Sequence, residues 1–103
     1  MPKGYWIGHV DVVDADAYRQ YAKLATDAVH HYGGRYLMRR GAHEIPEGAW
    51  RSIHVMIEFE SFQRARDCYH SAEYRAARKI REGAAQVDLL IVEGCEEDAP
   101  ASS

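Results

Sequence analysis

Two segments of this chain alternate apolar side chains with other residues, and this pattern constrains the fold more than any other feature. The apolar positions are Ile53, Val55, Ile57 and Phe59 in the first segment and Val87, Leu89 and Ile91 in the second. Because successive side chains of a β-strand point to opposite faces, each segment should have one wholly apolar face. A matching set near the start of the chain is formed by Trp6, Gly8, Val10 and Val12. These strands are expected to share one sheet whose apolar face packs under helices.

Helical patterns separate the strands and set the order of the elements. A helix should begin after Asp14, whose side chain can accept hydrogen bonds from free N–H groups, and end at Gly33-Gly34. Strands are predicted over 5–13, 35–40, 50–59 and 87–92, with a loop over 41–49 and a second helical segment over 61–83. The order β-α-β-β-α-β predicts an α+β, ferredoxin-like fold. Its four antiparallel strands should lie in the spatial order 4-1-3-2, with both helices on one face.

The second helical segment is interrupted around Ser71. Residues repeat at helical spacing before this point and again after it, at Phe62, Ala65 and Tyr69 and then at Tyr74, Ala77, Ile80 and Ala84. The Ser71 hydroxyl can cap the start of a new helix. One interpretation is that the break places Tyr69 or His70 at the mouth of a pocket, with Tyr74 as one wall. The other interpretation is a kink locked by side-chain hydrogen bonds, with a role in packing alone.

Composition and charge argue against several classes of protein. The chain has 103 residues and a formal net charge of −3, so it lacks the basic excess that would hold nucleic acid or an anionic membrane. Residues 1–95 are expected to form one domain, followed by a flexible acidic tail over 96–103. No apolar run is long enough to span a membrane and no signal peptide is evident, so we expect a cytoplasmic protein.

The sequence carries no motif for a cofactor or a metal. Gly33-Gly34 ends a helix instead of starting one, so no glycine-rich phosphate loop is predicted. The six histidines form no H-E-x-x-H pair. A set of two imidazoles and one carboxylate from His9, His54 and Glu58 would suit a metal, but no spacing in the sequence supports it. We therefore expect no cofactor and no metal.

The sheet face away from the helices should combine apolar and ionisable side chains. Its apolar members are expected to be Ile7, Leu37, Met56, Leu90 and Val92. A sheet face in water is normally polar throughout, and an apolar patch of this extent is unusual on a monomer. We expect a second copy of the chain to cover this face, sheet against sheet, in a closed dimeric α/β barrel with a partly polar interior.

Four ionisable residues predicted on that face are the candidate catalytic groups: His9, Arg39, His54 and Glu58. In the predicted strand order His9 can approach His54, and Arg39 can pair with Glu58. In an enzyme, His54 or His9 would move a proton, Arg39 would stabilise an oxyanion and Glu58 would orient the imidazole. The alternative is a polar network that only fixes the geometry of a dimer. Trp50 is expected to act as a lid over the barrel mouth or as a dimer contact.

Several short motifs together resemble one bacterial family. They are Tyr5-Trp6-Ile7, Asp14-Ala15-Asp16-Ala17-Tyr18, Tyr32-Gly33-Gly34-Arg35-Tyr36-Leu37, Arg39, Glu47-Gly48-Ala49-Trp50-Arg51, Ile57-Glu58-Phe59, Tyr69-His70-Ser71-Ala72-Glu73-Tyr74 and Asp88-Leu89-Leu90-Ile91-Val92-Glu93-Gly94. The chain is similar over 1–94 to the family catalogued as domain of unknown function 1330, in the dimeric α/β-barrel superfamily. The resemblance implies a ferredoxin-like protomer that pairs through its sheet, and it implies no established reaction. The wider superfamily includes cofactor-independent monooxygenases, haem-degrading enzymes and lactone isomerases, whose catalytic motifs are not matched by this sequence.

Two functional hypotheses follow. In the first, each protomer of a homodimer encloses a pocket between sheet and helices for a small polar or aromatic metabolite. If that protein is an enzyme, its reaction is expected to be acid–base chemistry without a cofactor. In the second, the protein is a non-catalytic structural or ligand-binding homodimer module, whose polar interior only sets the register of the two copies.

Overall fold

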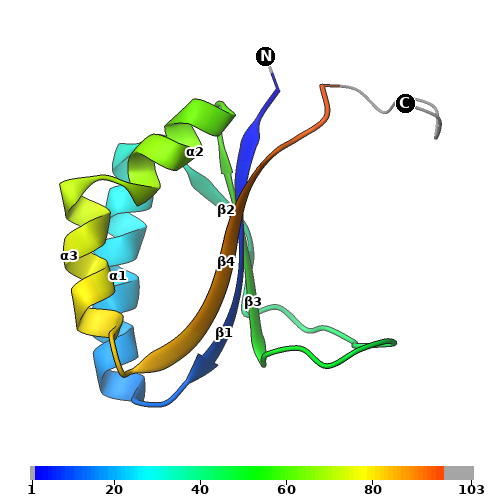
Figure 1. Cartoon of the computed structure of the whole chain (residues 1–103), viewed down its shortest axis with the longest axis vertical. Coiled ribbons are helices and arrows are strands. Elements are labelled where there is room, and N and C mark those ends of the chain that lie inside the picture. The colour runs from blue at the N-terminus through cyan, green and yellow to red at the C-terminus, as the bar shows by residue number, and fades with distance from the viewer. Residues whose placement is uncertain (1, 97–103) are drawn as a thin grey trace.

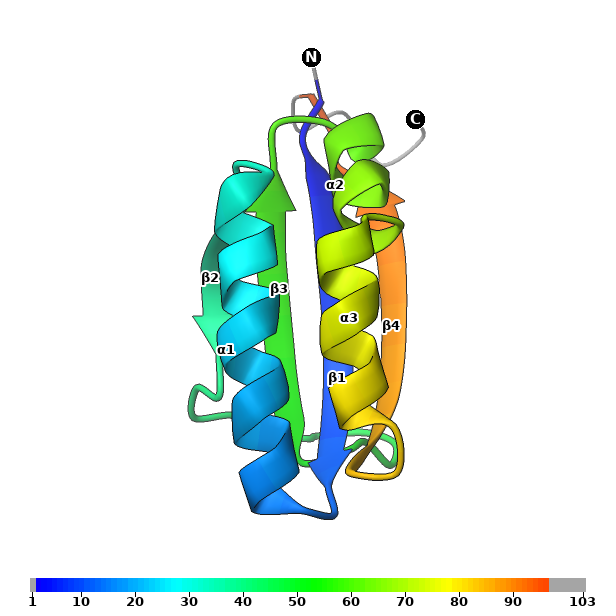
Figure 2. The ribbon, with the colours of Figure 1, turned by 90° about the vertical axis from the view of Figure 1, so that its left-hand side faces the viewer.

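The structure of the protein is a computed structural model that describes residues 2–96. Its elements in chain order are β1 (Gly4–Val12), α1 (Ala15–His31), β2 (Arg35–Arg39), β3 (Ile53–Phe59), α2 (Phe62–Tyr69), α3 (Ala72–Arg81) and β4 (Ala85–Glu93). All helices cover the same face of one sheet (Figure 1), with α1 running beside the α2–α3 pair (Figure 2). No helix formed by residues 2–96 lies on the opposite face of the sheet.

The sheet is antiparallel, and its spatial order is β2-β3-β1-β4. The predicted ferredoxin-like arrangement is therefore confirmed, with the second helical segment divided into α2 and α3. The central strand β1 places Gly8 opposite Val55 of β3 and opposite Leu89 of β4. Gly8 thus lies in the middle of the sheet, on the face that the helices cover.

Side-chain caps begin the helices where the sequence predicts them. The carboxylate of Asp14 accepts hydrogen bonds from the backbone N–H groups of Asp16 and Ala17, at 3.1 and 3.2 Å. The hydroxyl of Ser71 accepts one from the N–H of Tyr74 at 3.1 Å and donates one to the Cys68 carbonyl oxygen at 2.6 Å. Both caps satisfy backbone groups that a helix end leaves free. The predicted helix interruption is confirmed.

The core lies between the inner sheet face and the helices. Trp6, Ile57 and Phe59 from the sheet are buried against small residues of the helices, Ala25, Ala28, Ala65, Cys68 and Ala77. The indole N–H of Trp6 donates a hydrogen bond of 2.8 Å to the Ala65 carbonyl oxygen, so the one polar atom of this ring is satisfied. Small helix residues let the helices approach the sheet closely, and the large aromatic rings fill the space between them.

The connection between β2 and β3 is longer than predicted. The third strand begins at Ile53, not at Trp50, because residues 41–52 form an extended arm that leaves the sheet on the side away from the helices (Figure 1). The base of the arm is fixed by Arg51, whose Nε donates to Asp88 Oδ2 at 2.9 Å and whose Nη1 donates to Asp11 Oδ2 at 3.1 Å. These ion pairs join the arm to β1 and β4.

A β-bulge in β2 changes the side on which Arg39 lies. Tyr36 is opposite Ile57 and Met38 is opposite Met56, so one extra residue on β2 lies between them. Arg39 consequently lies opposite Val55, on the helix side of the sheet. The prediction that Arg39 shares the open face with Glu58 is wrong, because one inserted residue inverts the alternation of every position that follows it.

Among residues 2–96, no helix combines the length and the apolarity that crossing a membrane requires. Of the tail predicted over 96–103, only Glu96 belongs to the described residues.

Candidate functional site

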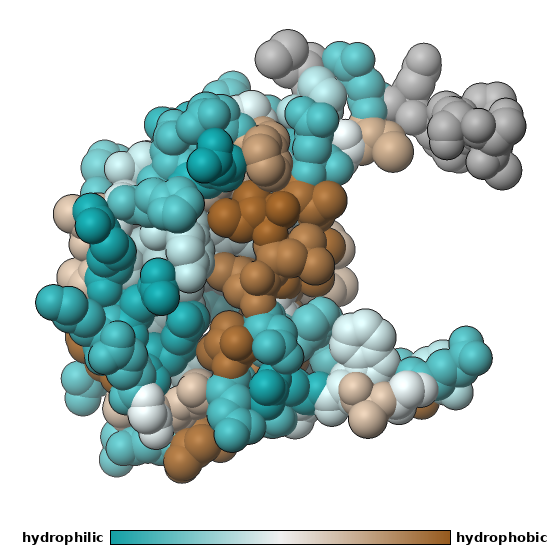
Figure 3. All heavy atoms as spheres, viewed as in Figure 1, coloured by the Kyte–Doolittle hydropathy of each residue, from teal (hydrophilic) through white to brown (hydrophobic). Residues whose placement is uncertain are grey.

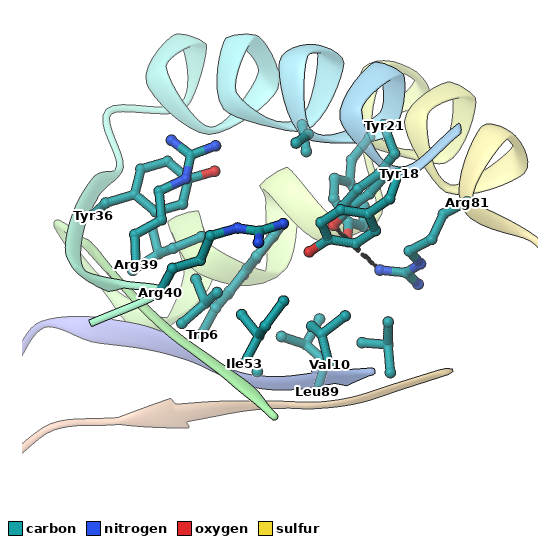
Figure 4. A pocket seen from close by; sticks show the side chains of 17 residues that line it. Trp6, Val10, Tyr18, Tyr21, Tyr36, Arg39, Arg40, Ile53, Arg81 and Leu89 are labelled. Atoms are coloured by element: carbon teal, nitrogen blue, oxygen red, sulfur yellow. Dashed lines mark hydrogen bonds between the residues drawn. The ribbon is translucent and has the colours of Figure 1, made fainter. Parts of the chain in front are cut away.

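A cavity of about 90 Å³ lies between the sheet and the helix layer. Figure 4 shows the strand residues Trp6, Val10 and Leu89 on one side of it and Tyr18 and Tyr21, from α1, on the other. Gly8 also lines the cavity, and a Cβ atom built there would lie 3.3 Å from Leu89 Cδ1. Because Gly8 has no side chain, the middle of β1 leaves room that a larger residue would fill. The cavity occupies the place where the first hypothesis expected a pocket.

Tyr21, Tyr74 and Arg81 form a hydrogen-bonded cluster at one end of the cavity. The two hydroxyl oxygens are 2.7 Å apart, and Nη1 of Arg81 donates to Tyr21 at 3.2 Å and to Tyr74 at 3.1 Å. Burial raises the pKa of both phenols, that of Tyr21 well above its usual value. Both hydroxyls are therefore protonated at neutral pH and can donate hydrogen bonds.

Arg39 and Arg40 reach the same cavity from the end of β2 (Figure 4). The guanidinium of Arg39 lies 4.0 Å from the centre of the Tyr36 ring and donates to Thr26 Oγ1 at 2.7 Å. Arg40 has a φ of 58°, in the left-handed region, and its guanidinium lies 5.7 Å from the centre of the Tyr18 ring. Consecutive strand residues normally point to opposite faces. The bulge and the left-handed residue together direct both arginines to one side.

His9 and His54 lie together on the opposite, open face of the sheet, as predicted. Their Nδ1 atoms are 2.9 Å apart. The ring of His43, from the arm, is centred 4.5 Å from that of His54. Loss of hydration, with the imidazoles of His43 and His9 nearby, holds the pKa of His54 below its usual range. We call His9, His43 and His54 the imidazole cluster.

Glu58 shares this face but does not reach the imidazole cluster. Its carboxylate accepts hydrogen bonds from Arg35 Nε and from the Tyr5 hydroxyl, both at 3.0 Å. These two donors lower the pKa of Glu58. Four positions along one strand correspond to about 13 Å, so Glu58 is too far from His54 to orient its ring. The predicted constellation is therefore separated, because Glu58 is held by Arg35 and Tyr5. Arg39 borders the open-face hollow that His9 and His54 line, but its guanidinium turns to the helix side and binds Thr26.

Trp50 covers the imidazole cluster, not the cavity. Its ring is centred 5.0 Å from that of His9, and its Nε1 donates to the Glu47 carbonyl oxygen at 3.1 Å. The Trp50 side chain remains 57% exposed on the arm. A role as a lid or as a dimer contact on the open face stays a prediction.

Of the three residues expected around the helix break, only Tyr74 lines the cavity. The Tyr69 ring packs in the core against Trp6, with ring centres 5.9 Å apart. His70 is exposed, and its ring lies against that of Tyr69. The hydrogen bonds of Ser71 lock the break, which agrees with the packing interpretation for Tyr69 and His70.

The sequence matches, over residues 3–95, the model of a family described as a domain of unknown function, DUF1330. The chain belongs to this family. The resemblance inferred from the short motifs is thereby confirmed, although the DUF1330 description assigns no activity. No curated protein matches the sequence.

Solved structures similar to this DUF1330 protein share its fold at low sequence identity. A protein of unknown function from Rhodopseudomonas palustris has a TM-score of 0.73 and 17% identity, over 93% of this chain and 85% of its own. A dimeric ferredoxin-like protein of unknown function from Thermobifida fusca has a TM-score of 0.60 and 12% identity, over 89% and 91%. SnoaB, a cofactor-independent oxygenase from Streptomyces nogalater, has a TM-score of 0.63 and 8% identity, over 95% and 97%.

Sequence reasoning missed most of the residues that line the cavity. Tyr18, Tyr21, Arg40 and Arg81 line it but are not among the candidate residues that the sequence predicts. Tyr18 and Tyr21 could have been found, because a face with several tyrosines at helical spacing carries hydroxyl groups into the core. Nothing in the local sequence predicts that the Arg40 side chain points into the cavity, because its direction depends on the bulge and on its own backbone conformation. Among residues 2–96, no group of three or more side chains is arranged to hold a metal ion.

Proposed function

We propose that this DUF1330 protein is a homodimer that binds a small metabolite in the cavity of each protomer. The observation that carries the proposal is the cavity itself, which interrupts an otherwise close-packed layer behind Gly8. Its walls are mainly apolar and aromatic, and a few hydroxyl and guanidinium groups converge on it. This combination is typical of small-molecule binding sites.

The dimer is supported by the open face of the sheet. Figure 3 shows apolar side chains gathered over the sheet on the side away from the helices. Leu90 and Val92 of β4 are 50% and 39% exposed there, and the arm adds the exposed Ile45. A second copy would present the same patch across a two-fold axis and would remove both patches from water. A structural neighbour with this fold is described as dimeric.

The residues that line the cavity suit the binding of a ligand better than they suit acid–base catalysis. Among the described residues that line the cavity there is no carboxylate, imidazole or amine, and arginine stays protonated at any ordinary pH. Tyr18, Tyr21 and Tyr74 have raised pKa values, so their hydroxyls stay protonated and are poor bases near neutral pH. The cavity thus offers hydrogen-bond donors to a ligand but no general base.

A second candidate function is cofactor-free acid–base chemistry at the imidazole cluster. The short contact between His9 and His54 and the lowered pKa of His54 support it, because a neutral imidazole can accept a proton. In a dimer the cluster would be covered by the partner. SnoaB shows that this fold occurs in a cofactor-independent oxygenase, which supports the candidate only at the level of the fold.

A thermal-shift screen with a diverse metabolite library tests the proposal. A ligand present at one hundred times its Kd stabilises the folded state by about 2.7 kcal/mol, which is readily measured. We expect a chemically related group of compounds to raise the unfolding midpoint and to occupy the cavity in a crystal structure of the complex. A flat response across the library would contradict binding. A compound bound at the imidazole cluster instead would favour the second candidate.

A further inference from the structure

We propose that the ligand of the cavity is a small organic anion with a flat apolar body, of the aromatic carboxylate class, and that Arg40 and Arg81 hold its charge. This inference rests on the proposed binding function and specifies the ligand of that same site. Charge, backbone geometry, hydrogen-bonding capacity and shape support it separately.

The cavity carries positive charge without a counter-charge. Its lining includes Arg39, Arg40 and Arg81 and no acidic residue among the part of the chain that the structure describes. No described carboxylate lies within 4.0 Å of these arginines, because the acids of the sheet pair elsewhere, Glu58 with Arg35 and Asp88 with Arg51. Three like charges around one space repel one another, and a bound anion would compensate them.

The backbone is distorted before Arg39, by the bulge between Tyr36 and Met38, and at Arg40, the residue that follows β2. The bulge turns Arg39 to the helix side, and the left-handed conformation of Arg40 turns the next side chain to that side as well. A non-glycine residue with positive φ is strained. Such strain is concentrated at binding sites, where bulges also redirect side chains. The guanidinium of Arg40 extends into the space between α1 and the sheet (Figure 4).

The hydrogen bonds around Tyr21 and Tyr74 leave donors that can serve an acceptor. Two hydroxyls that share one contact of 2.7 Å use one of their two protons for it. Arg81 only donates, so the second hydroxyl proton has no acceptor among residues 2–96. The Arg40 guanidinium likewise makes no hydrogen bond to a described residue. The Tyr21–Tyr74 pair and the Arg40 guanidinium therefore both offer hydrogen to a ligand that carries acceptor oxygens, and both Arg40 and Arg81 lie near Tyr18.

The apolar part of the cavity decides between an inorganic anion and an organic one. The floor is formed by aliphatic residues around Gly8, and aromatic rings of Tyr18, Tyr36 and Trp6 stand beside it. The cavity has only about 90 Å³, which limits a ligand to one small ring whose charged group extends toward the exposed residue Arg40. An enclosed apolar cavity of about 150 Å³ is known to bind benzene. Planar guanidinium groups bind carboxylates through two parallel hydrogen bonds.

Isothermal titration calorimetry on the full chain tests the inference. The probes are benzoate, salicylate and 4-hydroxybenzoate, each compared with its neutral amide, and inorganic phosphate as an anion without an apolar body. The variant is Arg40→Gln, which removes a guanidinium that is bonded to no described residue and should therefore fold. The matched control is Arg78→Gln, because Arg78 lies on α3 over the Tyr69 ring, outside the cavity.

We expect at least one carboxylate to bind more tightly than its amide and than phosphate. Arg40→Gln should weaken that carboxylate by about tenfold or more, and Arg78→Gln should leave its affinity unchanged. Equal binding of carboxylate and amide, or equal loss in both variants, would overturn the anion assignment and leave the pocket as a site for neutral molecules. If phosphate bound as tightly as the carboxylates, the inference that the ligand has an aromatic body would be wrong. Failure of every probe, together with a flat metabolite screen, would overturn the proposed function as well.

Discussion

The hydroxyl oxygens of Tyr21 and Tyr74 lie 2.7 Å apart although 53 residues separate them in the sequence. They join α1 to α3 at the end of the cavity, and the guanidinium of Arg81 binds both. The same two hydroxyls hold α1 against α3 and line the proposed binding site. A change to either hydroxyl should therefore affect both stability and ligand binding.

Tyr74→Phe should lower the free energy of unfolding by about 1–2 kcal/mol, because it removes a fully buried hydroxyl and leaves its partners short of one hydrogen bond. Urea unfolding followed by circular dichroism measures the change. Tyr69→Phe is the matched control on the neighbouring helix, and its hydroxyl makes no hydrogen bond to a described residue. We expect a change below about 0.5 kcal/mol for the control. Equal effects of the two variants would show that the cluster adds nothing to stability.

Gly8→Val should fill the cavity without unfolding the protein. The added Cβ would lie 3.3 Å from the end of the flexible Leu89 side chain and 3.9 Å from the Asp88 carbonyl oxygen, which is an ordinary contact, and valine suits a central strand better than glycine. Compounds that stabilise the wild-type protein in the thermal-shift screen should therefore lose their effect, while the stability without ligand is kept. Gly41→Val is the control, since a Cβ there has no neighbour within 4 Å and Gly41 lies on the exposed arm. Retained ligand response in Gly8→Val would place the binding site elsewhere.

Leu90→Asp should convert a dimer into a monomer at micromolar concentration, because it puts a charge in the centre of the apolar open face. Analytical ultracentrifugation distinguishes the two states. Leu24→Asp makes the same change on the outer side of α1, where the leucine is 40% exposed compared with 50% for Leu90. The control should remain dimeric. A monomeric wild-type protein, or a Leu90→Asp dimer, would contradict pairing through the sheet.

The imidazole cluster should make the protein less stable in mild acid. The pKa of His54 is lower in the folded chain than in the unfolded chain, where it has its ordinary value near 6.5. The unfolded state therefore binds more protons in the interval below about pH 6.5, and stability falls as the pH decreases through it. His54→Asn should reduce this dependence in urea unfolding between pH 7.5 and 5.

The control for that pH series is His70→Asn, which replaces an exposed imidazole outside the cluster. It should keep the wild-type slope of stability against pH. If His54→Asn and the wild-type protein lose stability in parallel, then His54 does not account for the acid sensitivity. If the wild-type protein gains stability in acid, the sign of the proposed linkage is wrong.

Much of the fold was predictable because it depends on local regularities. Alternation at every second residue in 53–59 identified the inner face of a strand, and Asp14 and Ser71 identified two helix starts. The approach of His9 to His54 followed from the same alternation, once the strand order was known. Each of these inferences uses residues within a few positions of one another, or a register without interruption.

The binding site was decided by tertiary structure. One extra residue in β2 moved Arg39 from the open face to the cavity, and a single positive φ moved Arg40 beside it. Whether a strand bulges depends on what packs against it, and no short sequence pattern encodes that. Tyr21, Tyr74 and Arg81 meet only because α1 and α3 lie side by side on the sheet. Periodicity along the chain thus determined which residues turn inward in each regular element, whereas contacts between distant segments determined which of them share one cavity.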